Sequence, residues 1–173
     1  VGRLSDPHTI VGPHVGSYEE DIGQYDEIKD YDFIDDVFML VSTDTIKETG
    51  AYDKDFFLQY EETDWCVRVR KAGYRIVYTP KAKIWHKGTL SSGGTHSPLN
   101  TFYNARNRTI FMKKNSTQSQ WFSYIIKLFF NVVPKRVINL VIKGQTHLIF
   151  SYISGIISSL IWIINFKPKN EGN

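Results

Sequence analysis

Residues 50–86 constrain the fold most, because a helical pattern is followed at once by a strand pattern. Apolar side chains recur at helical spacing over 61–72, and Gly73 then supplies a stop signal. The run 74–78 is β-branched and aromatic, and 83–86 alternates again after a proline. A helix flanked by such strands is typical of an α/β layer, so we expect a chain of the α/β class.

The first turn of this helix carries three acids, Glu61, Glu62 and Asp64. Negative charge is favoured at a helix N-terminus, and Asp64 can pair with Arg68 at the i,i+4 spacing, so a structural role is open. Three neighbouring carboxylates can also raise one another's pKa or bind a cation. Because Glu61 and Glu62 have no partner at helical spacing, they are the stronger candidates for chemistry.

The run FFLQYEETDWCVRVRKAGYRIVYTPKAKIWH resembles the C-terminal half of the catalytic domain of family 2 glycosyltransferases with the GT-A fold, especially the rhamnosyl- and galactofuranosyltransferase-like members. There the motif is approximately F-F-x-Y-x-E-D-x-D-x-x-x-R-x-x-x-x-G-Y, followed by a strand, a proline and a terminal histidine. The match extends over roughly residues 32–114. It implies the C-terminal half of a Rossmann-like GT-A domain, with a strand over 33–41 and a short helix over 43–49.

The resemblance also implies roles for the acids. Glu62 takes the position of the catalytic base, usually an aspartate, which accepts a proton from the acceptor hydroxyl during an inverting displacement. Because glutamate is one methylene longer, either Glu62 or Glu61 could lie closest to the acceptor. Asp64 resembles the second acid, which helps to hold the acceptor sugar. His86 resembles a histidine that completes the coordination of a divalent metal, Mn²⁺ or Mg²⁺, on the nucleotide-sugar donor.

Two further positions follow from the same resemblance. Asp36 lies in the segment beside the acceptor site, where we expect it to contact the acceptor or to have a structural role. Arg106 and Asn107 match an R-N pair in the helix after the catalytic core. For Arg106 two interpretations are open, a tie between that helix and the core or a contact with the donor phosphate.

Family members bind the nucleotide through an N-terminal βαβ half that ends in a D-x-D motif. The polar stretch before Tyr31 has no room for that half. We therefore expect this chain to be the C-terminal part of a longer protein, with the acceptor-side part of the catalytic domain in residues 1–97 and a helical tail in 98–173.

The tail is basic and apolar. Glu171 is the one acid after Lys113, among basic residues at 113, 114, 127, 135, 136, 143, 167 and 169. Such a tail favours an anionic lipid surface over nucleic acid, because its aromatics stand in apolar runs. Residues 147–166 contain no Asp, Glu, Lys or Arg and are long enough to span a bilayer, but serines and Gly155 dilute them. The tail is thus expected at the cytoplasmic face of the cell membrane, either peripheral or with one C-terminal span.

The sequence therefore predicts an inverting glycosyltransferase that moves a sugar from a nucleotide-sugar to a glycan or lipid-linked acceptor at the membrane. One alternative is a non-catalytic fragment that binds the acceptor and serves in assembly. Another is a small metal-binding module built on Glu61, Glu62, Asp64 and His86.

Overall fold

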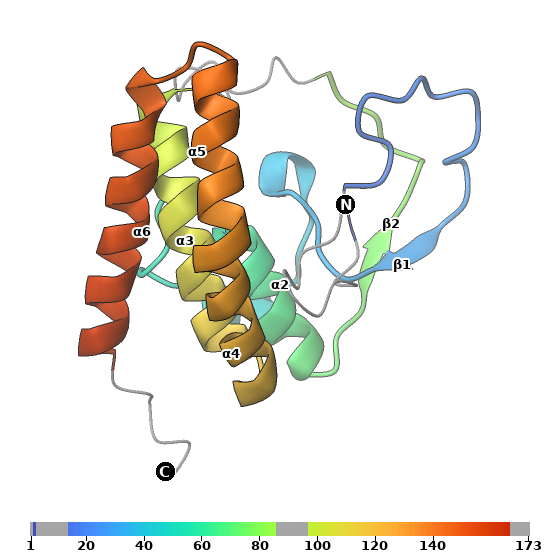
Figure 1. Ribbon diagram of the computed structural model, residues 1–173. Helices are drawn as coiled ribbons and strands as arrows, with labels where there is room; N and C mark the ends of the chain where they lie inside the picture. Colours follow the sequence, from blue (N-terminus) through green and yellow to red (C-terminus); the bar gives the residue numbers. More distant parts are fainter. Residues whose placement is uncertain (1, 3–13, 86–96, 167–173) are drawn as a thin grey trace.

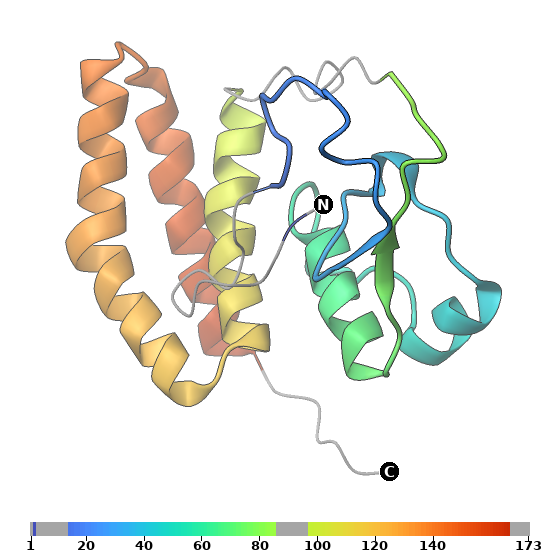
Figure 2. The same ribbon diagram turned by 90° about the vertical axis from the view of Figure 1, so that its right-hand side faces the viewer.

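A computed structural model describes residues 2, 14–85 and 97–166, which form a small α/β unit and a helical bundle that pack side by side (Figures 1 and 2). The α/β unit contains strands β1 (Lys29–Tyr31) and β2 (Ile76–Tyr78), the 3₁₀ turn η1 (Asp36–Phe38), and helices α1 (Thr43–Thr49) and α2 (Glu61–Lys71). The bundle contains α3 (Pro98–Asn115), α4 (Gln118–Lys127), the π-helical turn η3 (Leu128–Val132), α5 (Val133–Ile142) and α6 (His147–Asn165).

The α/β unit has a two-stranded antiparallel sheet in which Tyr31 is the register partner of Ile76. Its core consists of Phe33, Trp65, Cys66, Val69 and Ile76, so α2 packs against the chain on both sides of it in sequence. α2 begins with acids and ends with Arg68, Arg70 and Lys71, the distribution that the helix dipole favours. Gly73 follows with φ +90°. This conformation costs little only in glycine, which explains where the helix ends.

In the bundle, α4, η3 and α5 form one continuous helical path, and α6 returns alongside α3 (Figure 1). A capping box between Thr117 and Gln120 starts α4. The π turn lies directly before Pro134, whose nitrogen has no hydrogen to donate, and such a turn shifts the helix register at this point. The buried cluster includes Tyr124, Leu128, Leu140, Leu148 and Tyr152.

The helices expected from the sequence over 43–49 and 61–72 are present within one or two residues, and the tail that was expected to be helical contains α3, α4, α5 and α6. The prediction of a strand over 33–41 was wrong. Within the described chain, Phe33 forms one isolated bridge with Gly2, and the next residues turn into η1. A strand needs a partner along its length, and the neighbouring acids at 35 and 36 form side-chain contacts in a turn instead.

Two smaller differences concern the sheet. β1 lies in a stretch that was expected to be irregular, and residues 83–85 form no strand.

The domain boundary expected at residue 97 stays a prediction, but α3 contacts both parts of the molecule. It packs along α6 and also binds the loop before α2.

Candidate active site

Glu62 lies in the first turn of α2 and is partly buried. Burial raises the pKa of its carboxyl to about 7, and the negative charges of Glu61, Asp36 and Asp35 add to this effect, while the Glu62 backbone amide opposes it. A pKa near 7 lets one carboxyl both lose and accept a proton at neutral pH. Glu62 therefore has the properties of a general base.

Glu61 lies beside it with one carboxylate oxygen, Oε2, buried and without a hydrogen-bond partner among the described residues. Burial raises the pKa of this group, and the nearby charge of Asp36 raises it further. Leaving a buried carboxylate oxygen unpaired is unfavourable, and proteins do so mainly where a ligand or water supplies the donor. Glu61 is thus suited to accept a hydrogen bond from a ligand hydroxyl.

Asp36 lies in η1, on the same side of the unit as the start of α2. Its carboxylate accepts a hydrogen bond of 3.1 Å from the Tyr52 hydroxyl. Burial, and then the charge of Asp36, raise the pKa of Tyr52 well above its ordinary value, so the tyrosine stays a donor. The Tyr52 ring packs edge-on against Trp65 of α2, with centroids 6.1 Å apart. This chain of contacts fixes Asp36 relative to the two glutamates.

Asp35 is occupied by a different partner, His14, at 3.2 Å. The hydrogen bond from His14 lowers the pKa of Asp35 to about 2, and the same hydrogen bond raises the pKa of His14. Sequence reasoning missed both His14 and Tyr52. They are 21 and 16 residues from their aspartates, and no local pattern marks contacts at such separations.

The turn that delivers Glu61 and Glu62 has an unusual backbone. Leu58, Gln59 and Tyr60 have φ values of +58°, +81° and +73°, a left-handed conformation that costs energy in residues with a Cβ. The side-chain amide of Asn107 on α3 holds this turn, because its Nδ2 lies 3.1, 3.1 and 2.9 Å from the carbonyl oxygens of residues 57, 58 and 59. Strain that persists in this way is common at functional sites.

Asp64 forms the structural pair that its spacing allowed. Its side chain is 4% exposed, and its carboxylate accepts hydrogen bonds from Arg68 Nε at 3.1 Å and from Asn115 Nδ2 at 2.9 Å. Arg68 also donates to the carbonyls of Thr49 and Ala51. Asp64 thus joins α2 to α3 and to the end of α1 in this structure, and its expected contact with an acceptor sugar stays a prediction.

Arg106 likewise ties α3 to the α/β unit. Its Nη1 donates to the carbonyl oxygen of Asp55 at 2.8 Å and to Asn107 Oδ1 at 2.7 Å. The sequence left two interpretations open for Arg106, and these contacts correspond to the first, a tie between α3 and the core. A contact between Arg106 and a donor phosphate stays a prediction.

His86, the expected metal ligand, lies outside the described residues. Over the described ranges 14–85 and 97–166, no three Asp, Glu, His or Cys side chains form a group that could hold a metal. Asp64, one of the acids of the metal-module alternative, is occupied by Arg68 and Asn115. The described residues therefore do not fit a complete metal centre, and the divalent cation remains an expectation from the resemblance.

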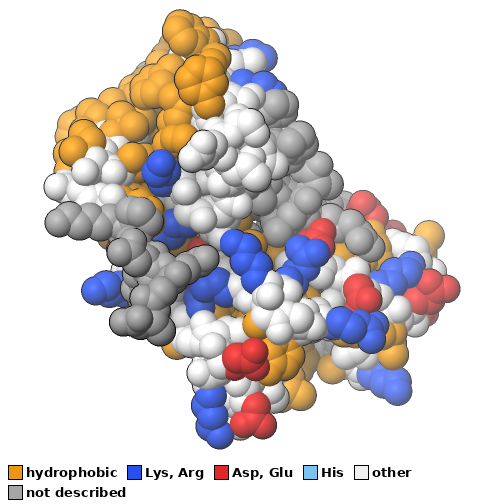
Figure 3. All heavy atoms as spheres, turned by 90° about the horizontal axis from the view of Figure 1, so that it is seen from below, with side chains coloured by type: hydrophobic (Ala, Val, Ile, Leu, Met, Phe, Trp, Pro, Cys, Tyr) orange, Lys and Arg blue, Asp and Glu red, His pale blue; other side chains and the backbone are white. Residues whose placement is uncertain are grey.

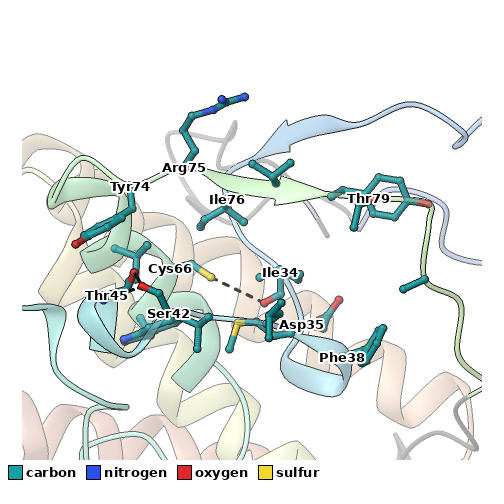
Figure 4. Close-up of a pocket in the computed structure, with 18 residues that line it drawn as sticks. Ile34, Asp35, Phe38, Ser42, Thr45, Cys66, Tyr74, Arg75, Ile76 and Thr79 are labelled. Atoms are coloured by element: carbon teal, nitrogen blue, oxygen red, sulfur yellow. Dashed lines mark hydrogen bonds between the residues drawn. The ribbon is translucent and has the colours of Figure 1, made fainter. Parts of the chain in front are cut away.

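A pocket of about 630 Å³ lies next to this acidic region, between the sheet and the helices α1 and α2 (Figure 4). Asp35 lines it together with mainly apolar side chains such as Ile34, Phe38 and Ile76. Among the described residues that line it, Arg75 is the one cation, and it is already ion-paired with Asp30 at 3.0 Å. The pocket thus suits an apolar group better than a diphosphate.

Comparison with known proteins relates the chain to a glycosyltransferase. It is 29% identical over 83 residues to the dTDP-rhamnosyl transferase RfbF of Shigella flexneri, a match that covers 44% of this chain and 28% of that protein. The chain thus spans little more than a quarter of the length of this relative. No family model matches the chain, and no solved structure matches it.

Proposed function

We propose that this chain forms the acceptor side of an inverting glycosyltransferase site in which Glu62 is the catalytic base. The observation that carries the proposal is the raised pKa of Glu62, about 7, at the start of α2 and next to the unpaired carboxylate oxygen of Glu61. As the acceptor oxygen bonds to the anomeric carbon, its proton passes to a Glu62 carboxylate oxygen. The bond from that carbon to the nucleoside diphosphate breaks at the same time, and the diphosphate leaves with the electron pair.

The neighbouring acids would orient the acceptor. The carboxylate of the half-buried Glu61 can accept a hydrogen bond from one sugar hydroxyl, and the exposed Asp36 can accept another while Tyr52 holds it in place. Glycans are rich in such donors, so we propose a glycan or lipid-linked acceptor. Because the acids stand on a rigid helix and a tethered turn, they would position the hydroxyl without much rearrangement.

For the donor we propose a nucleotide-sugar, and dTDP-rhamnose is the first to test because RfbF is named a dTDP-rhamnosyl transferase. A divalent metal, Mn²⁺ or Mg²⁺, would neutralise charge on the diphosphate when bound, as the resemblance implies. His86 would be among its ligands. The residues described here act on the acceptor and its proton.

The first prediction tests the base. In the full-length protein, Glu62→Gln should lower kcat by roughly 10³-fold, because the amide cannot take up the acceptor proton. Donor binding, measured by isothermal titration calorimetry, should stay unchanged. The matched control is Glu27→Gln, which changes an exposed glutamate paired with Lys29 and should retain activity. Full turnover by the Glu62→Gln variant would exclude Glu62 as the base.

A second proposal is a non-catalytic acceptor-binding role, because the clustered carboxylates of Asp36, Glu61 and Glu62 can accept hydrogen bonds from a glycan whether or not transfer follows. In that case Glu61 and Glu62 would bind glycan hydroxyls without transfer. Titration of the full-length protein distinguishes the two. Binding of a glycan acceptor but of no nucleotide-sugar, with or without Mn²⁺, supports the fragment, whereas donor binding supports the enzyme.

A further inference from the structure

The helical bundle has an outer face of exposed apolar side chains. On α6, Phe150, Ile157, Ile161 and Ile164 are 81, 51, 56 and 83% exposed, and their spacing places them along one side of the helix. α4, η3 and α5 add seven more large apolar side chains that are at least 43% exposed: Phe122, Ile126, Phe129, Phe130, Ile138, Val141 and Ile142. Figure 3 shows apolar side chains gathered on one part of the surface, with most charged side chains elsewhere. We call these eleven residues the outer face. A water-soluble surface rarely keeps so many together uncovered.

The charge around the outer face identifies what covers it. Residues 115–166 contain no Asp or Glu, whereas Lys127, Lys135 and Lys143 are exposed on α4, on α5 and just after α5. Apolar and aromatic side chains beside exposed positive charges suit the headgroup region of an anionic bilayer. A second copy of this chain would present the same positive charges, so the lysines of the two copies would repel one another.

The packing of α6 decides how it meets the bilayer. By length and composition it could cross a membrane, and 28% of its most apolar 18-residue window is buried. Its other side, however, packs closely along α3. A Cβ added to Gly155 would lie 2.4 Å from the Phe102 carbonyl oxygen and 3.1 Å from the Ala105 side chain. Leu148, Tyr152 and Ser159 are buried on this side.

α3 cannot follow α6 into the hydrocarbon. It carries Arg106, Arg108, Lys113 and Lys114, and charged side chains are costly there. It is also hydrogen-bonded to the turn before α2 through Asn107. An α6 that spans the bilayer would have to leave α3 and expose the apolar bundle core that the two helices share.

We propose that the outer face lies on an anionic membrane surface as an interfacial anchor, with α6 parallel to the bilayer plane and not across it. The apolar side of α6 enters the headgroup and upper acyl region, and the lysines pair with lipid phosphates. α3 then holds the acidic site at a fixed height above the membrane. Vesicle binding needs no sugar transfer, so it can succeed or fail independently of the transferase proposal.

Binding is tested by flotation of the full-length protein with vesicles of phosphatidylcholine alone or with about one-third phosphatidylglycerol. The anionic vesicles should bind more, and salt should weaken the binding. The double variant Ile157→Glu, Ile161→Glu should lower binding by roughly tenfold or more, because two exposed apolar groups are lost from the lipid contact. Ile22→Glu is the control, since Ile22 is 82% exposed in the α/β unit, and it should bind as before. Equal binding by the double variant, or a dimer in solution that does not bind vesicles, overturns the proposal.

The orientation of α6 is tested by measuring how deeply three of its positions enter the bilayer. Phe150→Cys, Ile157→Cys and Ile164→Cys are labelled one at a time with a fluorophore, and quenching by lipids brominated at different acyl positions is measured. Cys66 is 1% exposed and does not compete for the label. A parallel helix gives three similar shallow depths. A label at 157 that is much deeper than those at 150 and 164 shows a spanning helix and overturns the proposal.

Discussion

At the residue scale, the chemistry of the candidate site depends on the environment of one carboxyl group, that of Glu62. Glu62 keeps its proton up to about pH 7 because burial and the charges of Glu61, Asp36 and Asp35 disfavour its ionised form. The same environment makes the ionised form a stronger base than an exposed glutamate. The burial and the charge repulsion that raise the pKa of Glu62 also destabilise the fold once Glu62 is ionised, so activity and stability should respond to pH in opposite directions.

The pH dependence of the reaction follows from this pKa. With Glu62 as the base, kcat/KM for the acceptor should rise with pH and level off above a pKa of about 7. Asp36→Asn removes one of the nearby negative charges and should shift this limb to lower pH. An initial-rate profile between pH 5 and 9 measures both. The assignment would be contradicted if kcat/KM rose around pH 4.5 instead of pH 7. It would also be contradicted if the pH of this rise were the same in Asp36→Asn and the wild type.

Stability should change with pH in the reverse sense. The pKa of Glu62 is raised from 4.5 to about 7 on folding, so between these pH values the folded state binds more protons than the unfolded chain. Stability therefore falls as pH rises through this window. Glu62→Gln cannot ionise and should be more stable than the wild type at pH 8, by on the order of 2 kcal/mol, but equal to it at pH 4. Urea unfolding at both pH values measures the difference. A variant less stable at pH 8 would show that the charge is well compensated.

At the element scale, α2 is positioned by the left-handed turn before it and by Asn107 on α3. The turn places Leu58, Gln59 and Tyr60 in a conformation that costs roughly 1–2 kcal/mol per residue. Three carbonyl contacts to the Asn107 amide help to offset this cost. The first turn of α2, with both glutamates, is thus held by a residue more than 40 positions away in the sequence.

Asn107→Ala should therefore lower kcat by roughly 10- to 100-fold, because Glu62 would no longer be held in place. Gln59→Gly should partly rescue the variant, because glycine adopts positive φ at little cost. Kinetics of the two single variants and the double variant form a thermodynamic cycle, with circular dichroism to confirm folding. If Gln59→Gly changes kcat by the same factor in the wild type and in Asn107→Ala, the Asn107 amide does not act on Glu62 through the left-handed turn.

The sequence predicted helices well because their signals are local. The acids and bases of α2 and the stop at Gly73 act within one or two turns. It did not predict the left-handed turn, because Leu, Gln and Tyr carry no sign of positive φ. The family resemblance also implied a strand over 33–41, where the chain instead forms a turn whose acids contact His14 and Tyr52. Asp64 shows the same limit, since its Asn115 partner comes from another helix.

At the scale of the whole molecule, Lys114 connects the α/β unit to the bundle. Its side chain is 13% exposed, and its ammonium group contacts the carboxylates of Asp53 and Asp55 at 2.6 Å each. It also lies over the rings of Trp162 and Phe166 at the end of α6, at 5.3 and 5.9 Å. One side chain thus touches the loop before α2, α3 and the C-terminal helix. This contact would transmit the orientation of a membrane-bound α6 to the acidic site.

Lys114→Met should cost roughly 1–3 kcal/mol of stability, because it leaves two aspartates, each about one-third exposed and so partly screened by water, without their counter-ion. Adding Asp53→Asn and Asp55→Asn should restore more than half of the loss, since no uncompensated charge remains. Calorimetry measures the stabilities, and hydrogen exchange shows where protection is lost. If Lys114 couples the two parts, Lys114→Met should speed exchange both in residues 53–57 and at the end of α6. Faster exchange in residues 53–57 alone would limit Lys114 to a local ion pair and leave the bundle to hold the site through Asn107 and Asn115.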